Sequence, residues 1–244
     1  MDNIIIGRNA VMEAIENDHA IDKIMVAKGS QGSIGKVLAK AKSKGLVVQN
    51  VDKKLLDKLA EGRPHQGIAA QIAAYQYGEM EDIFRIAKAK QEDPFVIILD
   101  GIEDPHNLGA IMRSAECAGA HGIIIPKRHS AGLTEVVAKA SAGAIEYMPC
   151  VKVTNIAQTI EQMKKDGFWI AACDMGEHMY YEQNLTGPIA VVIGSEGFGI
   201  SKLVKEKCDY VVSIPMRGHI TSLNASNAAA ILMYEIRRQR DEGR

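Results

Sequence analysis

The chain has 244 residues, of which 47% are hydrophobic and 24% charged, and its formal net charge of -1 argues against a protein coated in basic residues. No apolar run reaches the roughly 20 residues of a membrane span, and the N-terminus lacks a basic-then-apolar signal layout. The four cysteines are scattered without a CxxC pair, so we expect a cytoplasmic protein with reduced thiols, no membrane segment and no bound metal.

Residues 1–75 alternate between short helical and short extended patterns. The spacing of apolar residues predicts helices over Asn9–Glu16, Ser33–Lys44 and Lys53–Leu59, and strands over Lys23–Ala27, Leu46–Val51 and Ile68–Ala73. A polar, charged stretch follows over residues 76–94. We therefore predict a small N-terminal domain (1–75) and a linker (76–94) that could contain a helix of its own.

From Phe95 the pattern changes to near-continuous apolar strands separated by helices. The expected strands are Val96–Asp100, Gly122–Pro126, Trp169–Asp174, Ile189–Gly194 and Tyr210–Pro215. The expected helices are Leu108–Gly119, Leu133–Ala144, Ile156–Lys165, Ile200–Lys207 and Leu223–Arg240. Strands that are apolar along their whole length are buried on both faces. Residues 95–244 are therefore predicted to form an α/β domain with a mostly parallel sheet.

Three polar segments follow predicted strands, at residues 99–119, 191–201 and 214–235. Each has an ordinary structural interpretation: Asn107 could be only a helix cap, Arg113 a surface residue, the glycines around Glu196 a turn, and the Ser and Asn residues at 222–227 helix caps. However, ligands of open α/β sheets bind at the carboxyl ends of the strands. Three such segments in one sheet are expected to converge on one crevice, which favours a binding site.

These segments resemble the SpoU (TrmH-like) branch of the SPOUT methyltransferases. DPHNLGAIMRSAECAG resembles the first motif of that family, VVIGSEGFGIS the second and IPMRGHITSLNASNAA the third, with Asn227 departing from the usual small apolar residue. IIGRNAVMEAI and RPHQGIAA resemble the ribosomal-protein-like (L30e-like) substrate-binding domain fused to many members. The greatest similarity is to members that methylate a guanosine ribose of large-subunit (23S) rRNA.

The resemblance implies a trefoil knot in the C-terminal domain, a homodimer with a shared active site, and S-adenosylmethionine as cofactor. It assigns the backbone around four residues to the cofactor: Gly194, Ile214, Met216 and Leu223. It assigns five residues to catalysis: Arg113 centrally, with Asn107, Glu196, Ser222 and Asn224 orienting cofactor and ribose. Because a guanidinium stays protonated at neutral pH, anchoring a phosphate or stabilising an alkoxide suits Arg113 better than proton abstraction.

RNA contacts are predicted on both domains. Arg8, Arg63 and His65 lie in segments that resemble the substrate-binding domain, whereas Lys127, Arg128, Arg217 and His219 follow strand ends near the expected site. The partner is rRNA, with tRNA as the alternative. A non-catalytic RNA-binding assembly protein is a further alternative. A phosphate loop at residues 29–37 is not supported, because Ser30 replaces the first required glycine and Val37 the required Ser or Thr.

Overall fold

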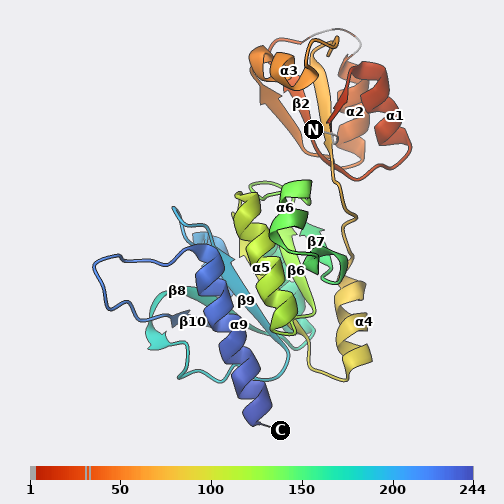
Figure 1. The fold of residues 1–244 in the computed structure, drawn as a ribbon. Helices are drawn as coiled ribbons and strands as arrows, with labels where there is room; N and C mark the ends of the chain where they lie inside the picture. The colour runs from red at the N-terminus through yellow and green to blue at the C-terminus, as the bar shows by residue number, and fades with distance from the viewer. Residues whose placement is uncertain (1–3, 31, 33, 244) are drawn as a thin grey trace. The chain divides into compact units, whose positions relative to one another are not determined.

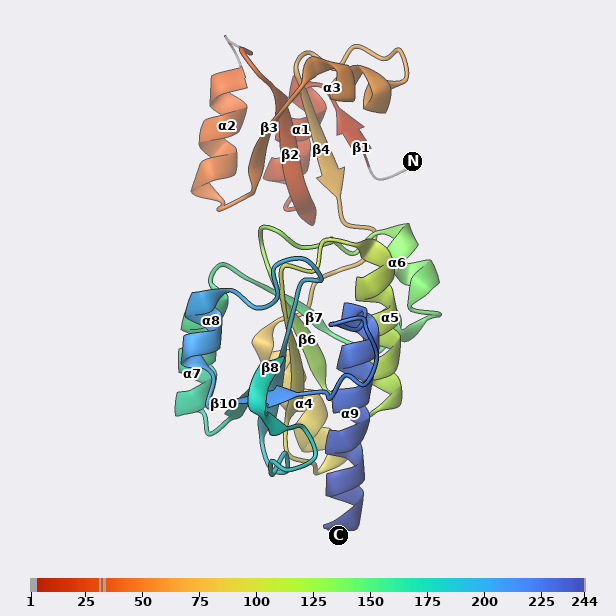
Figure 2. The ribbon, with the colours of Figure 1, turned by 90° about the vertical axis from the view of Figure 1, so that its left-hand side faces the viewer.

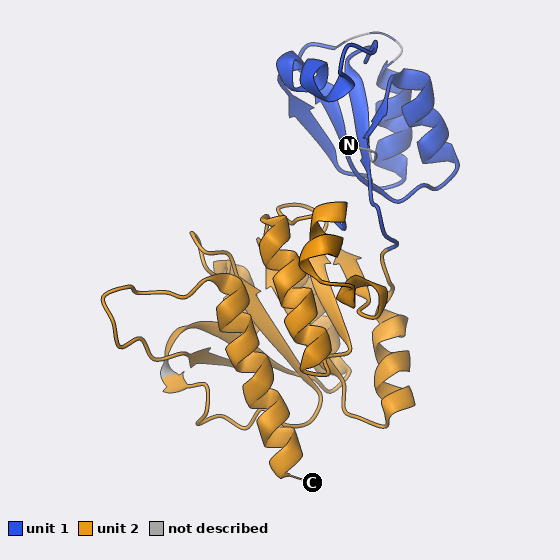
Figure 3. Cartoon of the chain, viewed as in Figure 1, with its two compact units in different colours: residues 1–76, 132–134 blue, residues 77–131, 135–244 orange. Residues whose placement is uncertain are grey.

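The computed structural model describes residues 4–30, 32 and 34–243. The chain divides into two compact units, which Figure 3 shows in different colours. Unit 1 holds residues 1–76 together with 132–134, and unit 2 holds residues 77–131 and 135–244.

Unit 1 is built on a four-stranded mixed sheet with the order β1-β4-β2-β3. Its strands are β1 (Ile4–Ile6), β2 (Ile21–Ala27), β3 (Val48–Val51) and β4 (Ile68–Ile72), and its helices are α1 (Arg8–Glu16), α2 (Ile34–Ser43) and α3 (Lys53–Ala60). Successive side chains of β2 enter two cores, because a strand points them to alternate faces. Ile24 and Val26 pack with α1 and α2, while Met25 and Ala27 pack with α3.

Unit 2 has a six-stranded sheet with the order β10-β8-β9-β5-β6-β7, in which every neighbouring pair is parallel. The strands are β5 (Phe95–Asp100), β6 (Gly122–Pro126), β7 (Cys150–Val153), β8 (Trp169–Met179), β9 (Ile189–Gly194) and β10 (Tyr210–Ser213). The helices are α4 (Met80–Lys90), α5 (Pro105–Cys117), α6 (Glu135–Ala140), α7 (Ile156–Lys165), α8 (Lys202–Lys207) and α9 (Ala225–Glu242), with a 3-10 turn at Ala144–Glu146. The predicted α/β domain with a parallel sheet is confirmed.

Helices cover both faces of this sheet, with α7 and α8 on one side and α5, α6 and α9 on the other (Figures 1 and 2). Val96 and Ile98 of β5 belong to the core that includes Ile83 of α4, Ile160 of α7 and Val204 of α8. Ile97 and Leu99, which alternate with them, are fully buried as well. Burial on both faces explains why β5 reads as a continuous apolar run.

The strand order reverses between β5 and β9, at the centre of the sheet. Asp100, the last residue of β5, lies beside Gly194, the last residue of β9. The loops that leave these two strand ends diverge toward opposite halves of the sheet. Such a switch point leaves a crevice at the carboxyl ends of the strands, where ligands of open α/β sheets bind.

Several elements differ from the sequence prediction. The expected linker belongs to unit 2 from Tyr77 onward, and the helix allowed for within it is present as α4. Strands β1 and β7 were not predicted, and the start of a helix at Ser33 lies outside the described residues. The single helix expected over Leu133–Ala144 ends at Ala140, because the chain turns through Ala142 and Gly143, both with positive φ. The trefoil knot stays a prediction.

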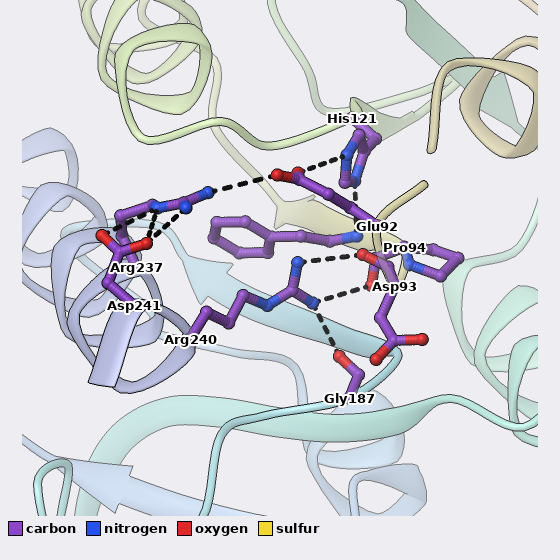
Figure 4. A network of polar contacts seen from close by, with 9 residues as sticks. Glu92, Asp93, Pro94, His121, Gly187, Arg237, Arg240 and Asp241 are labelled. Carbon is purple, nitrogen blue, oxygen red and sulfur yellow. Dashed lines mark hydrogen bonds and ion pairs between the residues drawn. The ribbon is translucent and has the colours of Figure 1, made fainter. Parts of the chain in front are cut away.

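A polar network closes the opposite, amino edge of the sheet of unit 2 (Figure 4). The Arg240 guanidinium donates to the carbonyls of Asp93 at 2.9 Å, Pro94 at 3.3 Å and Gly187 at 2.6 Å, immediately before β5 and β9. Arg237 pairs with Asp241 and lies 3.6 Å from Glu92. The C-terminal end of α9 is thereby anchored to the edge where the strands begin.

Candidate active site

Three side chains from the three polar segments form one hydrogen-bonded cluster at the carboxyl edge of unit 2. Asn107 Nδ2 donates to Glu196 Oε1 at 3.0 Å, and Asn224 Nδ2 donates to Asn107 Oδ1 at 2.9 Å. Asn224 Nδ2 also donates to Glu196 Oε1. We call these three residues the polar cluster. Asn107 and Glu196 lie 89 positions apart in the chain, and the reversed strand order brings them into contact.

Helix capping orients the amides of this cluster. Asn224 is the N-cap of α9, and its Oδ1 accepts from Ser226 N at 3.0 Å and Asn227 N at 3.4 Å. This arrangement directs Nδ2 of Asn224 toward Asn107 and Glu196. Asn107 is not itself a cap, because Asp104 accepts from the first backbone N–H groups of α5. The Asn107 amide is therefore available to the cluster, which excludes the interpretation that it serves only as a helix cap.

Glu196 receives all of its hydrogen bonds on one oxygen. Its Oε1 accepts from the two asparagine amides and lies 3.5 Å from Ala225 N. Within the part of the chain that the structure describes, no donor forms a hydrogen bond with its Oε2. The carboxylate is held in place through one oxygen, and the other is available to a hydroxyl group.

The loop that carries Glu196 is short and closed at its base. Ser195 N donates to Gly199 O at 3.0 Å, and Gly199 N donates back to Ser195 O at 2.9 Å. A Cβ atom on Gly194 would lie 2.2 Å from the backbone carbon of Gly199, so only glycine fits there. Ser201 N donates to Asp100 Oδ2 at 2.8 Å, which ties the end of the loop to β5.

A pocket of about 660 Å³ lies beside the polar cluster. Its lining includes all four residues predicted for cofactor binding, Gly194, Ile214, Met216 and Leu223, together with Glu196 and Ser222. This volume lies within the range of small-molecule sites. Apolar atoms supply most of the lining surface, and Asp174, Ser195 and Thr221 add polar groups. This mixture fits a nucleoside carrying an amino-acid arm, which is the chemistry of S-adenosylmethionine.

Strand β8 also contributes to this pocket, which was not predicted from the sequence. Val211 of β10 pairs with Ala172, but the next residue, Val212, pairs with His178, so residues 173–177 loop out of the β10 pairing. Cys173, Asp174, Met175 and Gly176 line the pocket. Asp174 also binds Lys205 at 2.9 Å. The sequence did contain an indication of this contribution. The predicted strand ends at Asp174, and ligands bind at the carboxyl ends of such strands.

Cys173 is an unreactive thiol in this setting. Burial, with a smaller contribution from the neighbouring Asp174 carboxylate, raises the pKa of Cys173 to about 12. The thiolate is the nucleophilic form of cysteine, so this thiol stays neutral near pH 7. We assign it to packing of the pocket wall.

Arg113 lies outside both the polar cluster and the pocket lining. It is exposed on α5, six residues after Asn107, which corresponds to about 9 Å along the helix axis. Among the described residues, no hydrogen bond or ion pair involves its guanidinium. Its charge is therefore available to an external anion.

The residues predicted to bind RNA fall into two groups. The first group follows the carboxyl ends of β6 and β10, at the same edge as the pocket, and consists of Lys127, Arg128, Arg217 and His219. Lys127 is half-buried, and the other three are exposed.

Three predicted RNA-binding residues lie in unit 1. Arg63 and His65 line a second pocket, of about 470 Å³, and His65 is held by Asp57 at 2.9 Å. Arg8 donates from Nε to Gln66 O at 3.0 Å, so part of this guanidinium supports the loop before β4. We infer that Arg8 acts in part by holding this loop.

The sequence profile of the SpoU rRNA Methylase family matches residues 94–234, more than half of the chain. The chain belongs to the SpoU rRNA methylase family. A second profile, for the substrate-binding domain of RNA 2′-O ribose methyltransferases, matches residues 4–78. The predicted resemblance to the SpoU (TrmH-like) branch is confirmed. The family uses S-adenosylmethionine, and this confirms the predicted cofactor.

Relatives of this SpoU methylase extend over nearly its whole length. It is 49% identical over 240 residues to YacO of Bacillus subtilis (strain 168), whose name places it among TrmH family tRNA/rRNA methyltransferases, and the match covers 97% of this chain and 96% of YacO. A protein of Staphylococcus haemolyticus (strain JCSC1435) with the same family name is 48% identical, over 99% of this chain and 97% of that protein. The chain is thus an RNA methyltransferase of the SpoU/TrmH family.

Solved structures share the fold of this SpoU methylase. AviRb of Streptomyces viridochromogenes, a SpoU methyltransferase solved with AdoMet, superposes with a TM-score of 0.62 at 26% identity, over 98% of this chain and 91% of AviRb. A TrmH/SpoU tRNA modifying enzyme of A. aeolicus gives a TM-score of 0.58 at 27% identity, over 67% of this chain and 84% of its own. Among the described residues, no helix is long and apolar enough to span a membrane.

Proposed function

We propose that this protein methylates the 2′-hydroxyl of a guanosine ribose in large-subunit (23S) rRNA. The observation that carries the proposal is the polar cluster beside the cofactor-sized pocket, because it places a carboxylate next to the site of the methyl donor. The N-terminal substrate-binding domain favours a structured RNA. The similarity of the motifs to rRNA-modifying members favours rRNA over tRNA.

Glu196 is proposed to orient the ribose hydroxyl and to accept its proton. Its Oε1 is occupied by the amides of Asn107 and Asn224, which leaves Oε2 for the substrate. Ser222, exposed in the pocket lining, is proposed to position the ribose or the adjoining phosphate. Holding two reacting groups in alignment supplies much of the rate of such a transfer.

Arg113 is proposed to bind the phosphate next to the target ribose and to stabilise the developing alkoxide. Arginine binds phosphate through two parallel N–H groups, and its fixed positive charge lowers the energy of an oxyanion. Its lack of an internal partner among the described residues suits this role, because no ion pair must break first. Its place on α5, outside the pocket lining, is compatible with an active site shared across a homodimer.

The cofactor is proposed to lie in the pocket against the backbone of Gly194, Ile214, Met216 and Leu223. When bound, S-adenosylmethionine supplies an electrophilic methyl group on a sulfonium centre. The apolar side chains of Ile193, Ile214 and Leu223 would lie against the apolar parts of the cofactor.

We further propose that the C-terminal domain contains a trefoil knot and that the protein works as a homodimer. Tyr234 on α9 is 53% exposed, which is compatible with a partner subunit at this helix. The proposed RNA contacts are made by seven residues: Arg8, Arg63, His65, Lys127, Arg128, Arg217 and His219. The four cysteines are free thiols, as expected in the reducing cytoplasm.

The test is methyl transfer from radiolabelled S-adenosylmethionine to unmodified large-subunit rRNA and to bulk tRNA. Arg113→Ala is expected to abolish turnover and to leave cofactor affinity within a few fold, because Arg113 does not line the pocket. Arg85→Ala, which removes an exposed arginine from α4, is the matched control and should keep full activity. Label in rRNA that disappears in Arg113→Ala supports the proposal.

Other outcomes of the methyl-transfer assay would change the proposed function. Label in tRNA alone keeps the chemistry and overturns the substrate. Lost cofactor binding in Arg113→Ala, or retained turnover, removes the role proposed for Arg113. No label in either RNA, with cofactor bound, points to an assembling ribosomal particle as substrate or to a non-catalytic RNA-binding protein.

A further inference from the structure

The most exposed large apolar side chain of the described residues belongs to Phe198, in the loop between β9 and α8. Its side chain is 97% exposed, so it packs against nothing in the chain. Phenylalanine is usually buried, and leaving it in water forgoes the stabilisation that burial brings. A ring in this position contributes almost nothing to the fold, which suggests that it contacts something outside the chain.

Hydrogen bonds hold the backbone of Phe198 in a defined conformation. Phe198 follows Glu196 and Gly197 in a turn closed by the two hydrogen bonds between Ser195 and Gly199. The Phe198 N–H also lies 3.3 Å from Ser195 Oγ. A binding group on a loop with little backbone freedom loses little entropy when it binds, which favours recognition.

Phe198 is close to the proposed reaction centre. Only one residue separates it from Glu196, so their Cα atoms are at most about 7 Å apart. Both neighbours of Phe198, Gly197 and Gly199, line the pocket. A nucleobase is bonded to the ribose carbon next to the one that carries the 2′-hydroxyl. A base at the modification site therefore falls within reach of residue 198.

We propose that Phe198 is a stacking platform for a nucleobase at the modification site of the RNA substrate. The inference rests on the proposed function and adds a residue that selects and positions the substrate. Aromatic side chains bind splayed-out bases of single-stranded RNA by stacking, and every base offers a π-face. Stacking would fix the nucleotide whose ribose contacts Glu196.

A nucleobase suits this ring better than a second copy of the chain. Stable dimer interfaces bury about 800 Å² on each partner, usually as a continuous apolar patch. The other loop residues from Ser195 to Lys202 are polar or glycine except Ile200, which is buried. Phe198 is thus the exposed large apolar side chain of residues 195–202, and a single ring matches one stacked base.

The experiment compares Phe198→Ala, Phe198→Leu and Phe198→Trp with the wild-type protein, all saturated with S-adenosylhomocysteine. The affinity for an unmethylated large-subunit rRNA transcript is measured by filter binding, the cofactor affinity by calorimetry and the assembly mass by sedimentation. Removal of one stacked base is expected to weaken RNA binding about 5- to 150-fold in Phe198→Ala. Phe198→Trp should keep the affinity, and Phe198→Leu should lose most of it, because leucine is apolar but cannot stack.

A matched control and a spectroscopic signal strengthen the test. Tyr147→Ala removes an aromatic ring that is 76% exposed before β7, at the opposite edge of the sheet, and it should bind RNA normally. Phe198→Trp combined with Trp169→Phe leaves a single tryptophan at the site. Its fluorescence should be quenched when RNA is added.

Each contrary result has a defined meaning. Wild-type affinity in Phe198→Ala or Phe198→Leu overturns the stacking proposal. A smaller sedimenting mass in Phe198→Ala shows that the ring contacts a second copy of the chain instead. If the wild-type protein methylates only tRNA, the variants are compared on that tRNA. Normal RNA binding here, together with no methyl transfer in the radiolabel assay with S-adenosylmethionine, refutes the proposed function alone.

Discussion

His121 makes the stability of unit 2 dependent on pH. This side chain is completely buried at the start of β6, and its Nδ1 accepts from the backbone N–H of Phe95 at 2.9 Å. Burial is the main cause that lowers the pKa of His121 from 6.5 to about 4, and the Lys90 charge lowers it further. Glu92, 3.3 Å from Nε2, opposes the shift only in part. Protonation would also place a hydrogen on Nδ1, against the Phe95 N–H.

The sign and size of the effect follow from this shift. Between about pH 6.5 and pH 4 the unfolded chain binds a proton at His121 that the folded chain does not, so stability falls as the pH falls through this window. Each pKa unit corresponds to 1.36 kcal/mol, which gives about 3 kcal/mol over the whole window. Between pH 7 and pH 5 the expected loss from this one group is about 1.8 kcal/mol.

The assay is denaturant unfolding followed by the fluorescence of Trp169, the only tryptophan, which reports on unit 2. His121→Asn keeps an acceptor near the Nδ1 position but cannot titrate. The wild-type protein should lose about 1.8 kcal/mol more than His121→Asn when the pH is lowered from 7 to 5. The same substitution at exposed His106 controls for loss of an imidazole. An identical pH dependence of the wild-type and His121→Asn proteins would refute the reasoning.

Two further predictions concern the site. Asn224→Ala should lower the free energy of unfolding by about 1 kcal/mol, because α9 loses its N-cap. Asn224→Asp keeps the cap but places a second carboxylate beside Glu196. Both variants should lose methyl transfer, and full turnover in either one contradicts the proposed cluster. Gly194→Ala should weaken cofactor binding about 5- to 150-fold in calorimetry, because its Cβ would strike Gly199. Gly35→Ala, in α2 of unit 1 and with nothing within 4 Å of the added Cβ, is the matched control, and equal affinities would show that the close backbone approach does not shape the pocket.

The fold of unit 2 was predictable where the strands are long and apolar. β5 and β9 read as buried strands because both of their faces are covered, and the cores around Val96 and Ile98 show this. β7 was missed because its four residues, Cys150–Val153, include a lysine and are too few to show a period. The helix expected over Leu133–Ala144 was overextended because Ala142 adopts a left-handed conformation that helix propensity does not reveal.

The sequence predicted that the loops of the site meet at one edge of the sheet, but not how their side chains interact. Strand ends and polar residues indicated that Asn107, Glu196 and Asn224 share one edge, but not that they bond to one another. Their orientation depends on which residue caps each helix, and Asp104 caps α5 where Asn107 was the candidate. The β8 contribution around Asp174 follows from a register shift against β10, which depends on strand pairing that one sequence does not show.

Helix α9 also sets the order in which the site is completed during synthesis. Its first turn supplies Ala225 and Ala228 to the pocket wall, and the residue before it, Asn224, to the polar cluster. Its far end supplies Arg240, which binds the carbonyls before β5 and β9. All these residues leave the ribosome after every strand of the sheet. A nascent chain that ends before α9 therefore lacks one wall of the pocket, and methyl transfer must wait until the rest of unit 2 has been made.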